Sequence, residues 1–163
     1  MAKQLRVLVI GAGAIGGWVG GRLALAGHAV TLVGRQSLAD AVAAGGLRLH
    51  APDGQAVVSD IRVITSVADA TPYGPFDLAL FTVKTYDTET AIAEMQATDL
   101  ETSTVLSLQN GVRSEAMLAA AFGPERVVAG TELNPISVPQ AGTVVLEKQR
   151  GGIGLAPVAP GAS

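Results

Sequence analysis

The sequence contains no cysteine and no long hydrophobic run. The absence of cysteine excludes disulfides, thiolate metal sites and a cysteine nucleophile. No apolar stretch reaches the roughly 18–20 residues that a membrane-spanning helix needs. A signal peptide is not expected either, because glycines interrupt the apolar stretch after Lys3 and Arg6 and no A-x-A-like cleavage site follows. We therefore expect a cytoplasmic protein without a membrane segment.

Charged residues make up only 15% of the chain, and its net charge is −3 with no cluster of Lys and Arg. A nucleic-acid-binding protein would usually carry a basic patch, so no nucleic-acid partner is expected. No H-E-x-x-H, Ser/His/Asp or paired-carboxylate pattern occurs. His28 and His50 have no partner at a recognisable spacing, so we expect both to be structural and expect no metal site.

The 163 residues are 48% hydrophobic, which suits one globular domain, and they alternate between strand-like and helix-like segments. Strands are predicted over residues 5–10, 29–33, 62–64, 76–83, 104–108 and 126–129, with a hairpin formed by 47–50 and 56–58. Helices are predicted over 14–26, 85–97 and 114–122, with Ser114 as an N-cap, and a short helix runs from the N-cap Ser37 to Ala44. Beyond residue 131 only short β segments follow. This order predicts a Rossmann-type, doubly wound, mainly parallel α/β sheet with a β-rich C-terminal extension.

A glycine-rich motif, G-x-G-x-x-G, directly follows the first predicted strand and opens the first helix. It comprises Gly11, Ala12, Gly13, Ala14, Ile15 and Gly16. In this context the first glycine permits the tight turn, the second lets a pyrophosphate approach the backbone, and the third lets the helix pack closely on the strand. The helix N-terminus offers free amides to the phosphates. The motif therefore predicts a dinucleotide site formed by these six residues. A glycine-rich turn with only a packing role is the alternative.

The residue that follows the second predicted strand indicates which dinucleotide is bound. An NAD site usually places a carboxylate there for the ribose 2′-hydroxyl, but Val33 is followed by Gly34 and Arg35. A guanidinium can pair bidentately with a 2′-phosphate and stack on adenine. We therefore expect NADP(H), with an exposed surface arginine as the alternative reading of Arg35.

Two further strand ends carry polar residues at the edge where parallel sheets bind ligands. Thr82, Lys84 and Asp87 follow one strand, and Gln109, Asn110 and Gly111 follow the next. Lys84 could meet a phosphate, a ribose or a substrate carboxylate, and Asn110 could bind the nicotinamide ribose or a carbonyl. A solvated helix-terminal lysine and an Asn-Gly turn are the alternatives.

Taken in order, "GAGAIGG", Arg35, "VKTYDTETA", "SLQNGV" and the final "PQAGTV…GGIG" resemble the ketopantoate reductase (2-dehydropantoate 2-reductase) family along the whole chain. The resemblance implies reduction of the keto group of 2-dehydropantoate by NADPH, in pantothenate biosynthesis. It also implies cofactor contacts by Thr82, Lys84, Asn110, Ile136 and Glu147, with Lys84 and Asn110 near the nicotinamide ribose and the substrate.

The resemblance implies that family members continue into a helical domain that supplies a proton-donating lysine and much of a dimer contact. We expect these 163 residues not to include that domain. We expect one dinucleotide-binding domain over residues 1–163: a Rossmann core (1–130), a β extension (131–155) and the start of a linker (156–163). Coenzyme binding with little turnover is the expected behaviour. A reductase of another 2-oxo acid, a non-catalytic regulatory module and an NAD-dependent dehydrogenase remain alternatives.

Overall fold

The computed structural model describes residues 3–109 and 113–159, which form two sheets and four α-helices. The strands of the main sheet are β1 (Arg6–Ile10), β2 (Ala29–Val33), β5 (Arg62–Ile64), β6 (Phe76–Phe81), β7 (Thr102–Ser107), β8 (Val127–Glu132) and β11 (Ile153–Pro157). The second sheet contains β3 (Leu47–Ala51), β4 (Gly54–Val58), β9 (Ile136–Gln140) and β10 (Thr143–Leu146). The α-helices are α1 (Ala14–Leu25), α2 (Gln36–Gly45), α3 (Thr88–Gln96) and α4 (Arg113–Phe122). Short 3₁₀ segments are η1 (Ala68–Tyr73), η2 (Thr85–Asp87) and η3 (Pro124–Arg126).

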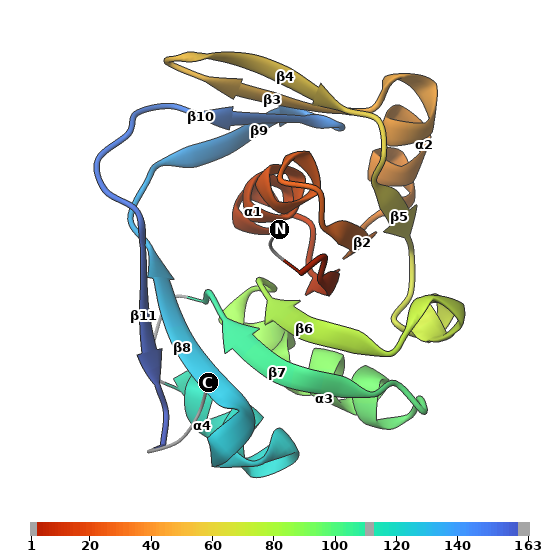
Figure 1. Cartoon of the computed structure of the whole chain (residues 1–163), viewed down its shortest axis with the longest axis vertical. Coiled ribbons are helices and arrows are strands. Elements are labelled where there is room, and N and C mark those ends of the chain that lie inside the picture. The colour runs from red at the N-terminus through yellow and green to blue at the C-terminus, as the bar shows by residue number, and fades with distance from the viewer. Residues whose placement is uncertain (1–2, 110–112, 160–163) are drawn as a thin grey trace.

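The main sheet has the strand order β11-β8-β7-β6-β1-β2-β5 (Figure 1). All neighbours are parallel except β11, which pairs antiparallel with β8 at one edge. Counting only the six parallel strands along the chain, this is the 3-2-1-4-5-6 order of doubly wound dinucleotide-binding folds. The order reverses between β1 and β6, and ligands bind at such a switch point. The predicted Rossmann-type fold is confirmed.

The β segments at the end of the chain divide between the two sheets. β9 and β10 join the hairpin of β3 and β4 in the order β4-β3-β10-β9, and β11 returns to the main sheet. Figure 1 shows α1 between the two sheets. Glycines allow this close approach: a Cβ built at Gly17 would lie 3.0 Å from Val144 Cγ2, and one at Gly21 would lie 2.9 Å from Leu49 Cδ1. The extra glycines of the first helix therefore serve packing.

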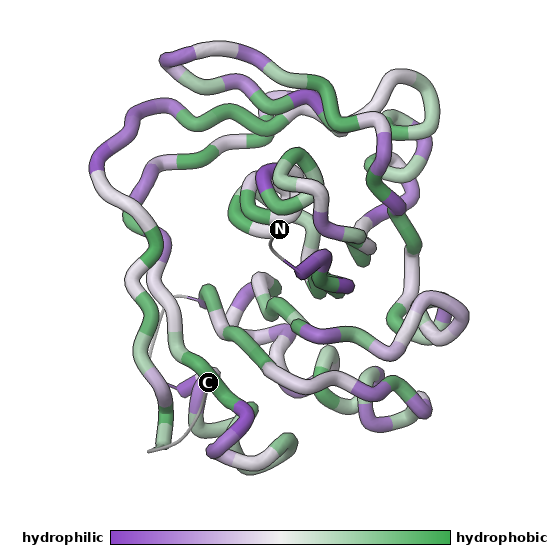
Figure 2. Tube along the Cα trace, viewed as in Figure 1, coloured by the Kyte–Doolittle hydropathy of each residue, from purple (hydrophilic) through white to green (hydrophobic). Residues whose placement is uncertain are grey.

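Two hydrophobic clusters cover the two faces of the main sheet, and β1 contributes to both. Leu8 and Ile10 belong to the cluster that α3 and α4 close, and Val7 and Val9 belong to the one shared with α1 and the second sheet. A strand buried on both faces reads as a continuous apolar run rather than as an alternating one. Figure 2 shows hydrophobic segments in the strands between the layers and hydrophilic residues at the loops.

The starts of two helices differ from the prediction. Arg35 is the N-cap of α2, and its carbonyl accepts hydrogen bonds from the amides of Leu38 and Ala39. Ser37 therefore lies inside the first turn and does not cap it. Ser114 also lies within α4, which already includes Arg113. Both predictions were wrong because the backbone becomes helical before the serine is reached.

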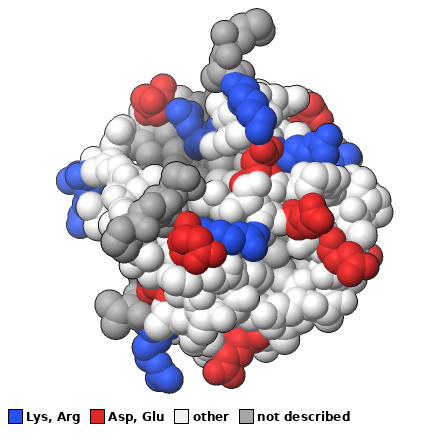
Figure 3. All heavy atoms as spheres, turned by 60° about the horizontal axis from the view of Figure 1, so that its bottom comes forward, with Lys and Arg blue, Asp and Glu red and all other residues white. Residues whose placement is uncertain are grey.

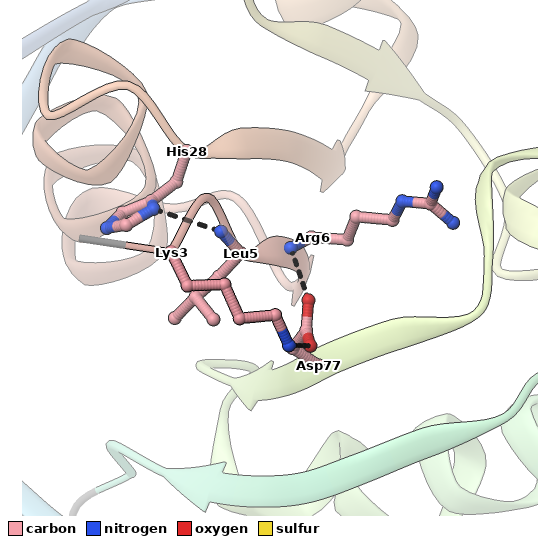
Figure 4. Close-up of polar contacts among 5 residues, drawn as sticks. All are labelled: Lys3, Leu5, Arg6, His28 and Asp77. Carbon is pink, nitrogen blue, oxygen red and sulfur yellow. Dashed lines mark hydrogen bonds and ion pairs between the residues drawn. The ribbon is translucent and has the colours of Figure 1, made fainter. Parts of the chain in front are cut away.

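A polar cluster holds the amino edge of the main sheet, opposite the strand ends that carry the glycine motif. Asp77 on β6 accepts hydrogen bonds from the Arg6 amide (2.8 Å) and from Lys3 Nζ (2.7 Å), as Figure 4 shows. In the same view His28 Nδ1 accepts the Leu5 amide at 3.2 Å. His28 is thus a structural residue that joins the α1–β2 turn to the start of β1.

This cluster predicts a loss of stability in acid. The amide of Arg6, and then the ammonium of Lys3, hold the pKa of Asp77 below its ordinary value. The folded state thus favours the ionised carboxylate. Its contribution is complete above the unfolded pKa of about 3.9 and is lost as the pH falls through the lower folded pKa. We expect Asp77→Asn to lower the free energy of unfolding at pH 7, with the difference from wild type shrinking below about pH 4. Urea titrations between pH 2.5 and 7 measure this, and a difference that stayed constant down to pH 2.5 would contradict it.

Charged side chains of both signs are interspersed on the surface seen from the side of α3 and α4 (Figure 3). Among residues 3–109 and 113–159, no helix combines the length and the apolar character that crossing a bilayer requires. The same residues contain no group of three or more His, Asp or Glu side chains arranged to hold a metal ion.

Candidate functional site

The glycine motif forms a tight turn at the end of β1. Gly11 has a φ of +100°, and a Cβ there would lie 2.7 Å from the backbone nitrogen of Val83. Gly16 is equally confined, since its Cβ would lie 2.4 Å from the Gly11 carbonyl oxygen and 2.5 Å from Thr82 Oγ1. A Cβ built at Gly13 meets nothing within 4 Å. The fold thus leaves no room for a side chain at Gly11 and Gly16, whereas Gly13 faces open space.

The N-terminus of α1 opens beside Gly13. Gly13 is the N-cap and makes no side-chain hydrogen bond, and the Gly17 amide donates to the Gly13 carbonyl at 2.8 Å as the first bond of the helix. The amides of the three residues in between precede the helical hydrogen-bond ladder and need other partners. These donors and the positive end of the helix dipole favour an anion.

The end of β2 lies against this loop and positions Arg35. The amides of Gly11 and Ala12 both donate to the Val33 carbonyl, at 3.2 and 2.9 Å. A Cβ built at Gly34 would lie 3.3 Å from Ala12 Cβ, so Gly34 has to be small for the two turns to meet. Arg35 follows directly and is exposed. Within the described part of the chain its guanidinium has no ion pair or hydrogen bond, so it is available to a ligand.

The end of β6 is tied to the same loop. Thr82 Oγ1 donates to the Gly11 carbonyl at 2.7 Å, and the Thr82 amide donates to the Ile10 carbonyl at 3.0 Å. This side chain, predicted to bind cofactor, is thus placed where it fixes the glycine turn. Lys84 lies two residues further, exposed, at the N-cap of η2. The structure therefore brings Thr82, Lys84 and the glycine motif together.

The end of β7 differs from the expectation that its polar residues face a ligand. Gln109 is only 7% exposed, and its Nε2 donates to the Val83 carbonyl and to Thr88 Oγ1, each at 2.8 Å. Ser107, the last residue of β7, donates to Glu115 Oε1 at 3.3 Å. Sequence reasoning missed this buried network, although a serine in the apolar run "TVLSL" was a signal for it. Asn110 and Gly111, the other predicted residues of this strand end, lie outside the described residues.

The start of α4 carries two buried oxygen atoms that need partners. Ser114 Oγ and Glu115 Oε2 are sealed from solvent and have no hydrogen-bond partner among the residues that the structure describes. A buried polar atom left unpaired costs about 1–3 kcal/mol. Both atoms lie close in sequence to the Asn110 segment, so this corner of the site is polar as well as buried.

The last two predicted residues lie on the second sheet. Ile136 begins β9, is half-buried and packs against the cluster that contains α1. Glu147 is exposed after β10, where its amide donates to the Pro135 carbonyl at 2.9 Å and its carboxylate accepts a hydrogen bond from Ser137. Both lie next to the connection from β8 that Figure 1 shows arching from one sheet to the other. Their contact with a cofactor stays a prediction.

One hollow lies near these strand ends, and another lies at the opposite, amino edge of the main sheet. One, of about 580 Å³, lies along β8 and β11 and is lined by Gln109, Glu115, Thr131 and Leu155, among others. The other, of about 500 Å³, lies at the amino edge and includes His28 and Asp60. Open α/β sheets bind ligands at the carboxyl ends of their strands, so only the first hollow adjoins the candidate site.

Together these strand ends combine several features that suit a phosphorylated ligand. Free amides, a helix dipole and the open space above Gly13 suit phosphate groups, and the guanidinium of Arg35 supplies a positive charge one strand away. Hydrogen bonds join the ends of β7, β6, β1 and β2 in turn, so the fold itself holds these strand ends next to one another.

Comparison with known proteins gives consistent matches. A family model described as ketopantoate reductase PanE/ApbA matches residues 7–159. A 2-dehydropantoate 2-reductase of Halobacterium salinarum is 38% identical over 144 residues, which cover 86% of this chain and 45% of that protein. The crystal structure of a PanE/ApbA family ketopantoate reductase from Ralstonia eutropha JMP134 has 32% identity and a TM-score of 0.80, over 89% of this chain and 47% of that one. The structure of 2-dehydropantoate 2-reductase from Geobacter metallireducens GS-15 has 28% identity and a TM-score of 0.84, over 96% and 50%.

The chain spans less than half the length of the curated relatives it matches, between 40% and 45% for the first three. The family model nevertheless matches residues 7–159, which include the glycine motif and, apart from Arg6 at the start of β1, every strand of the main sheet. The chain belongs to the ketopantoate reductase PanE/ApbA family.

Proposed function

We propose that this chain is the NADPH-binding part of an oxidoreductase that reduces the 2-keto group of a 2-oxo acid, with 2-dehydropantoate as the first candidate. The observation that carries the proposal is the open space at Gly13, next to the free amides of α1 and one strand away from Arg35. Membership of the family supports the reaction class, and the arginine after β2 supports the phosphorylated coenzyme.

The residues present fit this coenzyme by their chemistry. In the proposal the amides at the start of α1 bind the pyrophosphate, and the Arg35 guanidinium pairs with the 2′-phosphate. Lys84 and Asn110 serve the nicotinamide ribose and the substrate, and Ile136 and Glu147 border the cofactor from the second sheet. Thr82 acts through the glycine turn, whose carbonyl it holds.

When bound, NADPH would supply the hydride for the substrate carbonyl. This chain would hold the coenzyme, exclude water from its nicotinamide end and present the Lys84 ammonium as a hydrogen-bond donor beside it. The resemblance assigns the proton-donating lysine and the dimer contact to the helical domain of the family. We therefore propose coenzyme binding with little turnover by these 163 residues.

Isothermal titration calorimetry of the folded chain with NADPH and with NADH tests the binding proposal. We expect NADPH to bind at least tenfold more tightly, because only NADPH carries the group that Arg35 would hold. Equal affinity for both coenzymes would favour an NAD-dependent enzyme, and binding of neither would remove the proposed function.

The substrate is tested by supplying a helical domain of the family. We expect NADPH oxidation with 2-dehydropantoate to stay at background for this chain and to rise when the helical domain of a family member is added or fused. Turnover with a different 2-oxo acid under the same conditions would replace the substrate assignment. No turnover with any 2-oxo acid, despite coenzyme binding, would favour a regulatory module.

A further inference from the structure

Gln109 connects three elements at the carboxyl edge of the sheet. The ladder between β6 and β7 ends at Phe81 and Ser107, followed by one bond from the Leu108 amide to the Phe81 carbonyl at 3.0 Å. Beyond that point the side chain of Gln109 links the segment that follows β7 to the segment that follows β6. Its Nε2 donates to the Val83 carbonyl and to Thr88 Oγ1, both at 2.8 Å.

The orientation of this amide follows from its partners. A backbone carbonyl only accepts hydrogen bonds, so the nitrogen of Gln109 has to face Val83, and the second hydrogen of the same nitrogen reaches Thr88. The Gln109 oxygen points toward Ser107 Oγ at 3.5 Å, and that hydroxyl also lies 3.3 Å from Glu115 Oε1. The amide is thus enclosed on both sides, and Gln109 is 7% exposed.

The two partners of Gln109 bracket the segment that carries Lys84. Val83 comes directly before Lys84, and Thr88 begins α3. Between them lies η2, in which the Asp87 amide donates a hydrogen bond to the Lys84 carbonyl at 2.8 Å. One buried side chain therefore holds both ends of the exposed four-residue segment 84–87. The Lys84 side chain itself has no hydrogen bond or ion pair within the described residues, so its place is set by this backbone.

We propose that Gln109 is a positioning residue that sets Lys84 against the nicotinamide half of the coenzyme. This inference rests on the proposed function, because it takes Lys84 as the residue that meets that half. If Gln109 acts through Lys84, substituting Gln109 should weaken coenzyme binding only while Lys84 is present. If Gln109 serves only general stability, the same substitution should have its effect with or without Lys84.

The test compares two ligands and two substitutions. Gln109→Met keeps the length of the side chain and removes both donors. We expect it to weaken NADPH binding about tenfold, which corresponds to roughly 1.4 kcal/mol. The affinity for adenosine 2′,5′-bisphosphate, which has no nicotinamide half, should stay within about twofold of the wild-type value. Lys84→Ala should show the same pattern, and the double variant should bind NADPH no more weakly than Lys84→Ala alone. Gln96→Met, at an exposed glutamine of α3, is the matched control and should bind both ligands as wild type does.

Three results would overturn the inference. Equal losses for both ligands would show a general structural role, additive losses in the double variant would show independent action, and wild-type affinity in Gln109→Met would show no role. If Gln109→Met does not fold, Thr88→Val removes one of the two partners and should give the same ligand pattern with a smaller loss. Failure of wild type to bind NADPH would instead remove the proposed function, which is a separate outcome.

Discussion

Arg35→Ala is expected to weaken NADPH binding about 10- to 100-fold while leaving NADH binding nearly unchanged. A hydrogen bond to a charged group contributes about 1.5–3 kcal/mol, and in the proposed site the guanidinium bonds only to the 2′-phosphate that NADH lacks. The exposed side chain has no competing partner in the described structure, so its removal should cost little stability. Calorimetric titration of both coenzymes measures the change in preference.

Two controls separate this effect from the general loss of a positive charge. Arg48→Ala removes an exposed arginine from β3 on the second sheet, and it should bind both coenzymes as wild type does. Arg35→Lys keeps the charge but loses the bidentate geometry, so its affinity for NADPH should fall between those of wild type and Arg35→Ala. An equal loss of NADPH affinity in Arg35→Ala and Arg48→Ala would refute the assignment of the 2′-phosphate to Arg35.

The sequence predicted the main sheet well because its strands are short, apolar and bounded by glycine or by polar residues. The strand of residues 29–33 is found at those positions, and the hairpin of 47–50 and 56–58 is present with each strand slightly extended. Local pattern suffices for such elements, since burial on both faces leaves little choice of residue. The glycine turn was predictable from its spacing, and the confinement of Gly11 and Gly16 gives the steric reason for glycine at these two positions.

The remaining features depend on contacts between distant segments. The hairpin pattern contains nothing that states its partner, and β3 pairs with β10 almost a hundred residues later. Gln109 lies at a strand end whose polar residues were predicted to face a ligand, yet its buried amide reaches the backbone of Val83 and the hydroxyl of Thr88. Packing between distant segments decides whether a polar residue at a strand end faces a ligand or the core. Local sequence patterns do not reveal this packing.

Substitutions at two glycines of the motif, three positions apart, should separate an effect on stability from an effect on coenzyme binding. At Gly16 an added methyl group would meet the Gly11 carbonyl and Thr82 Oγ1, and neither can move without opening the turn. Overpacking of this kind costs about 1–3 kcal/mol. We expect Gly16→Ala to lower the free energy of unfolding by that amount, as measured by urea denaturation.

Gly13→Ala should behave in the opposite way. Its φ of −86° lies outside the left-handed region that favours glycine, and nothing lies within 4 Å of the added carbon, so stability should fall less than in Gly16→Ala. The methyl group would, however, fill the space through which the pyrophosphate approaches the amides of α1. Loss of even one charge-assisted bond of about 1.5–3 kcal/mol weakens binding at least tenfold, and NADPH and NADH should lose affinity together because they share the pyrophosphate. Wild-type affinity in a stable Gly13→Ala would contradict the site. A loss of stability equal to that of Gly16→Ala would show that the fold itself requires glycine at position 13, and that the glycine is not there to admit a ligand.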